Sequence, residues 1–159
     1  MSYRRNEHYL AVEDLLPLFA LEGVRLVNLQ YDDCREEVAW LEERFPGRLL
    51  HFEDLDQFND LDGVAALMEC LDLVVSAGTA VFELAGALGR PTMLLTNSSE
   101  AYWRKVPGSR VDVWQNSVVH VEAPVLGDKK GLVLELASEI QRLVATRAHA
   151  PETEQEALN

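Results

Sequence analysis

Residues 72–91 read Asp-Leu-Val-Val-Ser-Ala-Gly-Thr-Ala-Val-Phe-Glu-Leu-Ala-Gly-Ala-Leu-Gly-Arg-Pro, and this stretch decides the fold. The apolar run 73–75 predicts a strand, the small residues 76–79 predict a turn, and residues 80–88 predict a helix that Gly89 ends. A strand that passes through a glycine turn into a helix directs main-chain N–H groups and the positive end of the helix dipole at one point. The stretch therefore predicts an anion site, most often a phosphate site.

The alternation of strands and helices continues on both sides of this stretch. Strands are predicted at 24–30, 48–52, 92–96 and 117–121, and helices at 12–21, 34–45, 61–71 and 131–147. Val- and Leu-rich strands separated by helices are typical of right-handed βαβ units and of a parallel sheet covered on both faces. The predicted fold class is α/β, a three-layer Rossmann-like domain with a mainly parallel sheet. A long irregular segment is expected at 97–116.

Length and charge limit the classes of protein to consider. The 159 residues suit one domain, predicted at 1–148, and the polar, acidic tail 149–159 is predicted to be disordered. A net charge of −13 argues against a nucleic-acid partner or an anionic membrane surface, because either needs a basic face. Two widely separated cysteines indicate reduced thiols, and no signal peptide or membrane span is visible in the sequence. The expected localisation is cytoplasmic.

The turn at 76–79 is the best candidate for a binding site. Ligands of open α/β sheets bind beyond the carboxyl ends of the strands, where this turn lies. Gly78 permits close approach of the main chain, the Thr79 hydroxyl can donate to a phosphate oxygen, and the amides of Thr79 and Ala80 are expected to point outward. The alternative is an ordinary β–α turn with a threonine cap. Local pattern alone favours that alternative, because neither G-x-G-x-x-G nor G-x-x-x-x-G-K-[ST] is present. The missing G-x-G-x-x-G also makes a nucleotide-dependent oxidoreductase a weak candidate.

Two further groups of residues have both a functional and a structural interpretation. The Asp-x-Asp pairs at 54–56 and 60–62 match a pattern that binds Mg²⁺ or Mn²⁺, but a helix cap at Asp60 or Asp62 and solvated carboxylates are the favoured interpretation, so no metal is predicted. Arg104 or Lys105 can neutralise a phosphate. Trp103 and Trp114 can equally anchor a long loop against the sheet.

Three matches point to a known family. They are Val27-Asn28-Leu29-Gln30-Tyr31, the ordered run of residues 54–91, and Asp112-Val113-Trp114 before the last strand. Through them, residues 25–121 resemble the C-terminal, nucleotide-sugar-binding half of GT-B glycosyltransferases. The likeness is closest to the heptosyltransferase-like domains that follow tetratricopeptide repeats in many bacterial proteins.

The resemblance implies a ligand and its binding residues. A nucleotide-diphosphate sugar would place its diphosphate on the turn Gly78–Ala80 and its base and ribose near the acidic loop after 48–52. The expected binding residues are Ser76, Gly78, Thr79, Ala80, Glu83, Asp56 and Arg104, with no metal and no further cofactor. This chain departs from the family at two positions, since Gly78 stands where the family usually has Asp and Glu83 where it often has His. Glu83 resembles a ribose-binding glutamate of other GT-B enzymes, but a helix-surface carboxylate is the favoured interpretation.

The resemblance covers one half of a two-domain enzyme. In GT-B enzymes the acceptor and the general base usually come from the N-terminal half, so no catalytic residue is assigned and the isolated chain is not expected to turn over. The predicted function is a donor-binding domain of a glycosyltransferase-like protein. The alternative is a non-catalytic α/β assembly module that keeps the fold without donor binding. An unpaired sheet edge favours a homodimer or pairing with the missing half.

Overall fold

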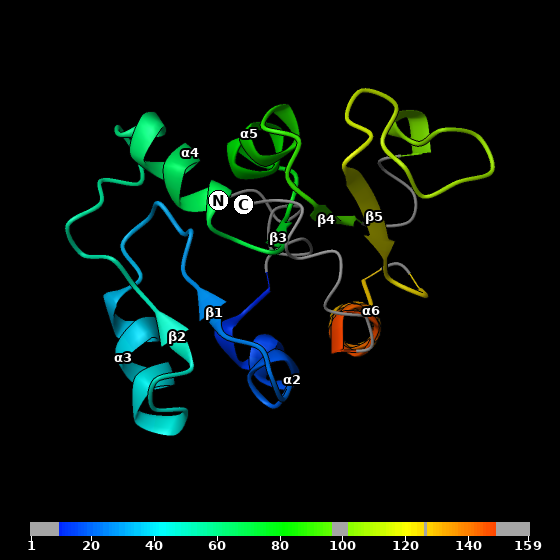
Figure 1. The fold of residues 1–159 in the computed structure, drawn as a ribbon. Coiled ribbons are helices and arrows are strands. Elements are labelled where there is room, and N and C mark those ends of the chain that lie inside the picture. The colour runs from blue at the N-terminus through cyan, green and yellow to red at the C-terminus, as the bar shows by residue number, and fades with distance from the viewer. Residues whose placement is uncertain (1–9, 97–101, 126, 149–159) are drawn as a thin grey trace.

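The computed structural model describes residues 10–96, 102–125 and 127–148 (Figure 1). The tail predicted at 149–159 lies outside these residues. The elements follow the predicted order: η1 (Val12–Leu15), α2 (Leu16–Phe19), β1 (Leu26–Val27), α3 (Arg35–Arg44), β2 (Leu49–Leu50), α4 (Leu61–Glu69), β3 (Val74–Ser76), α5 (Ala80–Ala87), β4 (Thr92–Thr96), η2 (Tyr102–Arg104), β5 (Val118–Glu122) and α6 (Lys129–Ala148). Pro17 falls at the start of α2, where its missing N–H costs nothing.

The pairs between the described strands β1 to β5 are all parallel. β1 pairs with β2, and β3, β4 and β5 form a second sheet in that order. The fold class is therefore α/β with parallel sheets, as predicted, although the strands form two ladders rather than one continuous sheet. β1 is only two residues long, and its Leu26 packs against the same apolar cluster as Val75 of β3 without a ladder between them.

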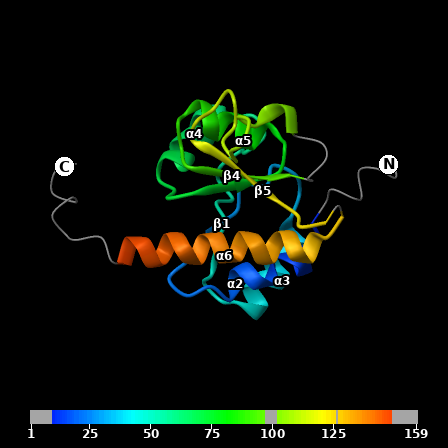
Figure 2. The same cartoon turned by 90° about the vertical axis from the view of Figure 1, so that its right-hand side faces the viewer.

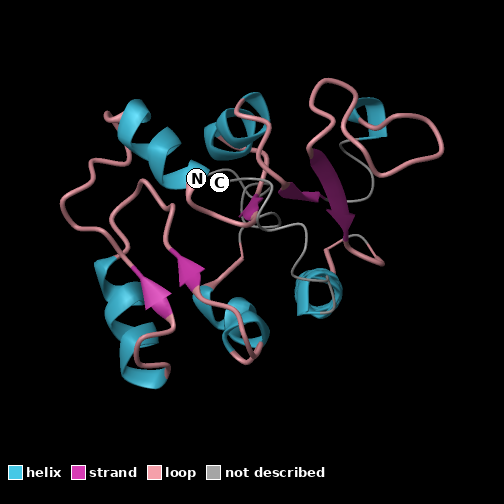
Figure 3. Ribbon diagram, in the orientation of Figure 1, coloured by secondary structure: helices cyan, strands magenta, loops and turns pink. Residues whose placement is uncertain are grey.

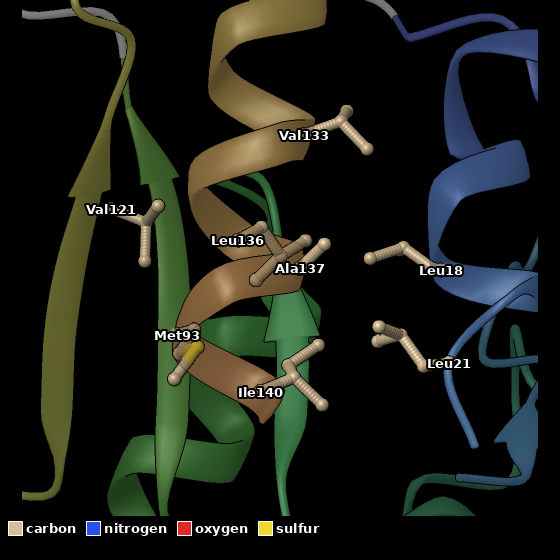
Figure 4. Close-up of a cluster of buried hydrophobic side chains, with 8 residues drawn as sticks. All are labelled: Leu18, Leu21, Met93, Val121, Val133, Leu136, Ala137 and Ile140. Atoms are coloured by element: carbon tan, nitrogen blue, oxygen red, sulfur yellow. The ribbon is translucent and has the colours of Figure 1, made fainter. Parts of the chain in front are cut away.

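Helices cover both faces of the strands (Figure 3). α4 and α5 lie on one face, and α2 and α6 lie on the other (Figure 2). The larger core cluster fills the space between the strands and the pair α2 and α6, and its buried members are Leu18, Leu21, Met93, Val121, Val133, Leu136, Ala137 and Ile140 (Figure 4). A second cluster, built on Val64, Met68, Val74 and Ala85, joins α4 and α5 to β3. This is the three-layer arrangement that the alternating pattern predicts.

The ends of α4 and α5 follow ordinary capping chemistry. Asp60 is the N-cap of α4, and its side chain accepts a hydrogen bond of 2.9 Å from the Gly63 amide. Gly89 ends α5 with φ +70°, a left-handed conformation that glycine adopts without a steric penalty. The structural interpretation of Asp60 is therefore confirmed.

Part of the segment expected to be irregular forms an edge hairpin, defined here as residues 104–113. Its two arms pair antiparallel, with the Val106 amide donating to the Val111 carbonyl at 2.9 Å. The second arm lies along β5, where the His120 amide donates to the Arg110 carbonyl at 2.8 Å and the Asp112 amide to the Val118 carbonyl at 3.0 Å. The hairpin therefore covers the outer edge of β5, so that edge does not need a second chain to satisfy it.

The larger core cluster sets the stability of the domain. Leu136 is fully buried in it, so Leu136→Ala is expected to lower the free energy of unfolding by about 2–5 kcal/mol through lost burial and a residual cavity. Leu143, on the same helix, is 45% exposed. Leu143→Ala is therefore expected to change the free energy of unfolding by less than about 0.5 kcal/mol. Urea unfolding followed by circular dichroism measures both. Equal losses in the two variants would contradict the packing described here.

Candidate functional site

The turn after β3 lies at the surface, where a ligand can reach it. Ala77, Gly78 and Ala80 are exposed, and Ser76 and Thr79 are half-buried. A side-chain Cβ built on Gly78 would meet no atom within 4 Å, so the space above this residue is open. Thr79 is the N-cap residue of α5 with an extended main chain, and its side chain makes no capping hydrogen bond.

The hydrogen bonds of the turn correct one expectation. The Thr79 amide does not point outward, because it donates to the Ala77 carbonyl at 2.7 Å within the turn itself. Ser76 Oγ donates to the same carbonyl at 2.9 Å and lies 3.2 Å from Thr79 Oγ1. Within the described residues, the amides of Gly78 and Ala80 have no hydrogen-bond partner. The available main-chain donors at the start of α5 are thus Gly78 and Ala80, whereas the sequence suggested Thr79 and Ala80.

Glu83 and Arg104, both expected to bind a ligand, bind each other. Arg104 Nη1 lies 2.6 Å from Glu83 Oε1, and Nη2 lies 3.4 Å from Oε2. Arg104 is only 9% exposed, whereas the Glu83 side chain is 48% exposed. Glu83 is therefore not a free surface carboxylate. It is the outer partner of a buried cation that comes from η2.

Arg104 has a second, fully buried carboxylate partner on the edge hairpin. Its Nε donates to Asp112 Oδ2 at 2.8 Å, and the amide of Trp114 donates to Asp112 Oδ1 at 2.9 Å. Burial by itself would raise the pKa of Asp112, but the hydrogen bonds from Arg104, the Trp114 amide and His120 outweigh it and hold that pKa below its usual value. Asp112 stays ionised and fixes both the guanidinium and the main chain at Trp114.

His120 of β5 completes this buried network. Its Nε2 lies 3.3 Å from Asp112 Oδ2, and its Nδ1 is buried without a hydrogen-bond partner in the described residues. Burial lowers the pKa of His120 below its usual value, and the nearby Asp112 opposes this shift without cancelling it. The imidazole is therefore neutral at physiological pH, with Nε2 as the donor to Asp112.

Three aromatic rings surround the guanidinium of Arg104. Its Cζ lies 4.6 Å from the ring centre of Trp114, 4.8 Å from that of Phe82 and 5.8 Å from that of Trp103. Phe82 is buried, but Trp103 is 55% and Trp114 65% exposed. The two indoles therefore do not anchor the loop against the sheet, as one interpretation of the sequence had it. They cover the arginine from the solvent side.

Asp56 makes all its hydrogen bonds within its own loop. It accepts from the amides of Phe58 and Asn59 at 3.0 Å and from Asn59 Nδ2 at 2.8 Å. The hydrogen bonds from Asn59 and Phe58 lower its pKa, so the carboxylate is ionised at neutral pH. No hydrogen bond or ion pair among the described residues joins Asp56 to the turn after β3 or to Arg104. The structure thus brings Glu83 and Arg104 together and leaves Asp56 apart.

A polar cluster at the ends of β1 and β2 was not predicted from the sequence. The side-chain amide nitrogen of Asn28 lies 3.1 Å from Cys34 Sγ and 3.1 Å from His51 Nδ1. Gln57 Nε2 donates to the Asn28 carbonyl at 3.0 Å. Asn28 and His51 directly follow neighbouring parallel strands, whose carboxyl ends lie at the same edge of the sheet. This position in the sequence could have predicted that the two side chains meet.

Neither a metal cluster nor a membrane span emerges from the residues that the structure describes. No group of three or more His, Cys, Asp or Glu in this part of the chain is arranged to hold a metal ion. None of the helices described is long and apolar enough to cross a bilayer.

Comparison with known proteins gives one partial relative. The chain is 40% identical over 102 residues to Protein FlbA of Caulobacter vibrioides. The match covers 64% of this chain but 17% of FlbA, so the chain spans less than a fifth of that protein's length. No protein-family model matches the chain, and no solved structure matches it.

The buried histidine gives the domain a predictable pH dependence. Because the folded-state pKa of His120 lies below the ordinary value of 6.5, the unfolded chain binds the proton more readily, and stability falls as the pH drops through that value. His120→Gln keeps a donor for Asp112 without a titrating ring. We expect the variant to show a flatter decline of unfolding free energy from pH 7 to pH 5, by up to about 1.4 kcal/mol per pH unit.

Urea unfolding at a series of pH values measures this difference. Measurements at pH 8, where the wild-type imidazole is neutral, serve as the reference for both proteins. If the unfolding free energies of the two proteins had the same slope against pH below pH 7, His120 would bind protons equally well in the folded and unfolded chains.

Proposed function

We propose that this chain is a donor-binding domain of a glycosyltransferase-like protein and that its ligand is a nucleotide-diphosphate sugar. The observation that carries the proposal is the exposed turn between β3 and α5, with open space above Gly78. The amides of Gly78 and Ala80 have no hydrogen-bond partner in the part of the chain that the structure describes. These donors lie at the carboxyl end of a parallel strand and at the positive end of a helix dipole. The resemblance of residues 54–91 to GT-B domains supports the same ligand class.

The turn can contribute three kinds of contact to a diphosphate. The amides of Gly78 and Ala80 donate to phosphate oxygens directly. The Thr79 hydroxyl can exchange its contact with Ser76 for a phosphate oxygen, since only one neutral hydrogen bond is given up. Arg104 can add a charge-assisted donor if a phosphate takes the place of Glu83, which is the more exposed of its two carboxylate partners.

The proposal assigns binding and no catalytic step to this chain. A GT-B reaction needs an acceptor and a general base held near the donor, and the proposed site residues supply neither. A second domain, in the same polypeptide or in a partner, is proposed to supply them. FlbA, in which the matching segment makes up 17% of the chain, shows that a relative of this domain occurs within a much longer protein. A cytoplasmic location is part of the proposal, because the two cysteines, Cys34 and Cys70, are free thiols.

Substitution at Gly78 tests the diphosphate site. Gly78→Val places a branched side chain in space that is empty in the structure, so the fold is retained while close approach of a phosphate is blocked. Binding of UDP-glucose, GDP-mannose, dTDP-glucose or ADP-glucose is expected to weaken by about tenfold or more, equivalent to about 1.4 kcal/mol. Ala87→Val, at the other end of α5, is the matched control and keeps wild-type affinity.

Amide NMR titration measures these affinities and locates the ligand. We expect the largest shifts at Gly78 and Ala80 in the wild-type protein. The proposal fails if none of the four nucleotide sugars shifts these amides at about 1 mM, a concentration at which even weak binding of about −4 kcal/mol is visible.

A non-catalytic assembly module is the second candidate function. The Thr79 amide is already bonded to Ala77, and Arg104 is already paired with Glu83 and Asp112, which is the arrangement of a fold that has no anionic ligand to bind. This candidate expects a homodimer or a protein partner instead of a nucleotide sugar. Sedimentation at several protein concentrations, with and without UDP-glucose, separates the two functions.

A further inference from the structure

Trp103 and Trp114 form an exposed aromatic corner beside the edge hairpin. Their ring centres lie 5.3 Å apart, and the ring planes are inclined by 67°, which is the edge-to-face geometry that aromatic pairs prefer. Both side chains remain more than half exposed. These two large side chains therefore contribute little to the buried core, and more than half of each one is open to solvent.

The corner is held rigidly from beneath. The Arg104 guanidinium covers one side of the Trp114 ring at 4.6 Å, and Arg104 is itself fixed by Asp112 and Glu83. Asp112 also accepts from the Trp114 amide, which fixes the main chain that carries the indole. A surface whose side chains are already ordered loses little conformational entropy on binding a ligand.

Polar groups suited to hydroxyls lie next to the rings. The Glu83 carboxylate is 48% exposed and has about four lone-pair positions, of which Arg104 and Gln115 take three at most. Gln115 directly follows Trp114 in the chain, and its Nε2 lies 3.1 Å from Glu83 Oε2. An aromatic face thus borders a carboxylate that can accept from a hydroxyl group.

This combination fits a pyranose ring. An indole face carries negative potential, which attracts the weakly positive C–H groups on the flat side of a pyranose ring. The hydroxyls at the edge of such a ring donate to carboxylates. A cationic ligand fits less well, because Arg104 already occupies one side of the Trp114 ring. A nucleobase can also stack on the rings and donate an N–H to a carboxylate, so UDP and GDP without a sugar are needed to separate a base from a pyranose.

We propose that Trp103, Trp114 and the Glu83 carboxylate form a binding platform for a pyranose ring. The inference rests on the geometry of this corner and does not require the diphosphate site. Two sources offer this chemistry: a free glycan, or the sugar of the proposed nucleotide-sugar ligand, since Glu83 and Arg104 belong to both sites.

Tryptophan fluorescence and saturation-transfer NMR test the platform. The chain has three tryptophans, so Trp40→Phe leaves only the two platform indoles as reporters. Methyl glucoside, methyl mannoside and N-acetylglucosamine represent free pyranoses, and UDP-glucose, GDP-mannose and UDP-N-acetylglucosamine represent linked ones, each at up to about 10 mM. UDP and GDP without sugar are measured beside them. Trp114→Ala is the test variant, and Phe58→Ala, which removes an aromatic ring that is 68% exposed elsewhere, is the matched control.

The expected result is saturation transfer to pyranose protons and a fluorescence change, with affinity lowered about tenfold by Trp114→Ala and unchanged by Phe58→Ala. A response to the free pyranoses identifies a glycan as the source. A response confined to linked pyranoses identifies the donor sugar. Either result supports the platform.

Other results overturn the platform and can be told apart from failure of the proposed function. If UDP shifts the amides of Gly78 and Ala80 but no pyranose, free or linked, contacts the indoles, the donor site stands and the platform is wrong. If free pyranoses bind while UDP and GDP do not, the platform stands and the donor site is wrong. A response that Trp114→Ala leaves unchanged overturns the platform. So does self-association that this variant abolishes without any response to sugar, because the indoles then form a protein contact.

Discussion

The buried ion pair between Arg104 and Asp112 is the constraint on which the candidate site depends. A guanidinium that is 9% exposed must be compensated, and the fully buried Asp112 does this at 2.8 Å. Removing one partner of such a pair leaves an uncompensated buried charge, which costs about 3–5 kcal/mol. The pair links the end of η2, where the first arm of the edge hairpin begins, to the second arm, and that second arm pairs with β5. The outer edge of the sheet is therefore closed by the same interaction that places Arg104.

This constraint explains the surroundings of Arg104. One carboxylate neutralises the guanidinium inside the protein, and Glu83 satisfies the outward-facing nitrogens at the surface. The aromatic rings of Phe82, Trp103 and Trp114 complete the shell, because a guanidinium is weakly hydrated and stacks well on ring faces. The exposure of the two tryptophans follows from their position over a buried cation at the rim of the fold.

The sequence predicted the fold well because the fold depends on local patterns. The apolar spacing of α4 and α6, the strand–turn–helix at 72–91 and the cap at Asp60 each follow from residues close together in the chain. The edge hairpin had a local signal too, since Pro107 and Gly108 form its turn and Gly108 has φ +75°. The contacts of the candidate site had no such signal. Arg104 and Glu83 are 21 residues apart, and nothing in either local sequence indicates that they meet.

The shared carboxylate at Glu83 has a thermodynamic consequence if both proposed sites exist. A phosphate that binds Arg104 displaces Glu83, and the released carboxylate then has more free lone pairs for a hydroxyl group. Because coupling between binding sites is reciprocal, a sugar hydroxyl that draws Glu83 away would equally favour the phosphate at Arg104. A ligand that carries both groups would benefit from this coupling within one molecule. With both sites present, the position of Glu83 would therefore favour a sugar phosphate over a sugar or a phosphate alone.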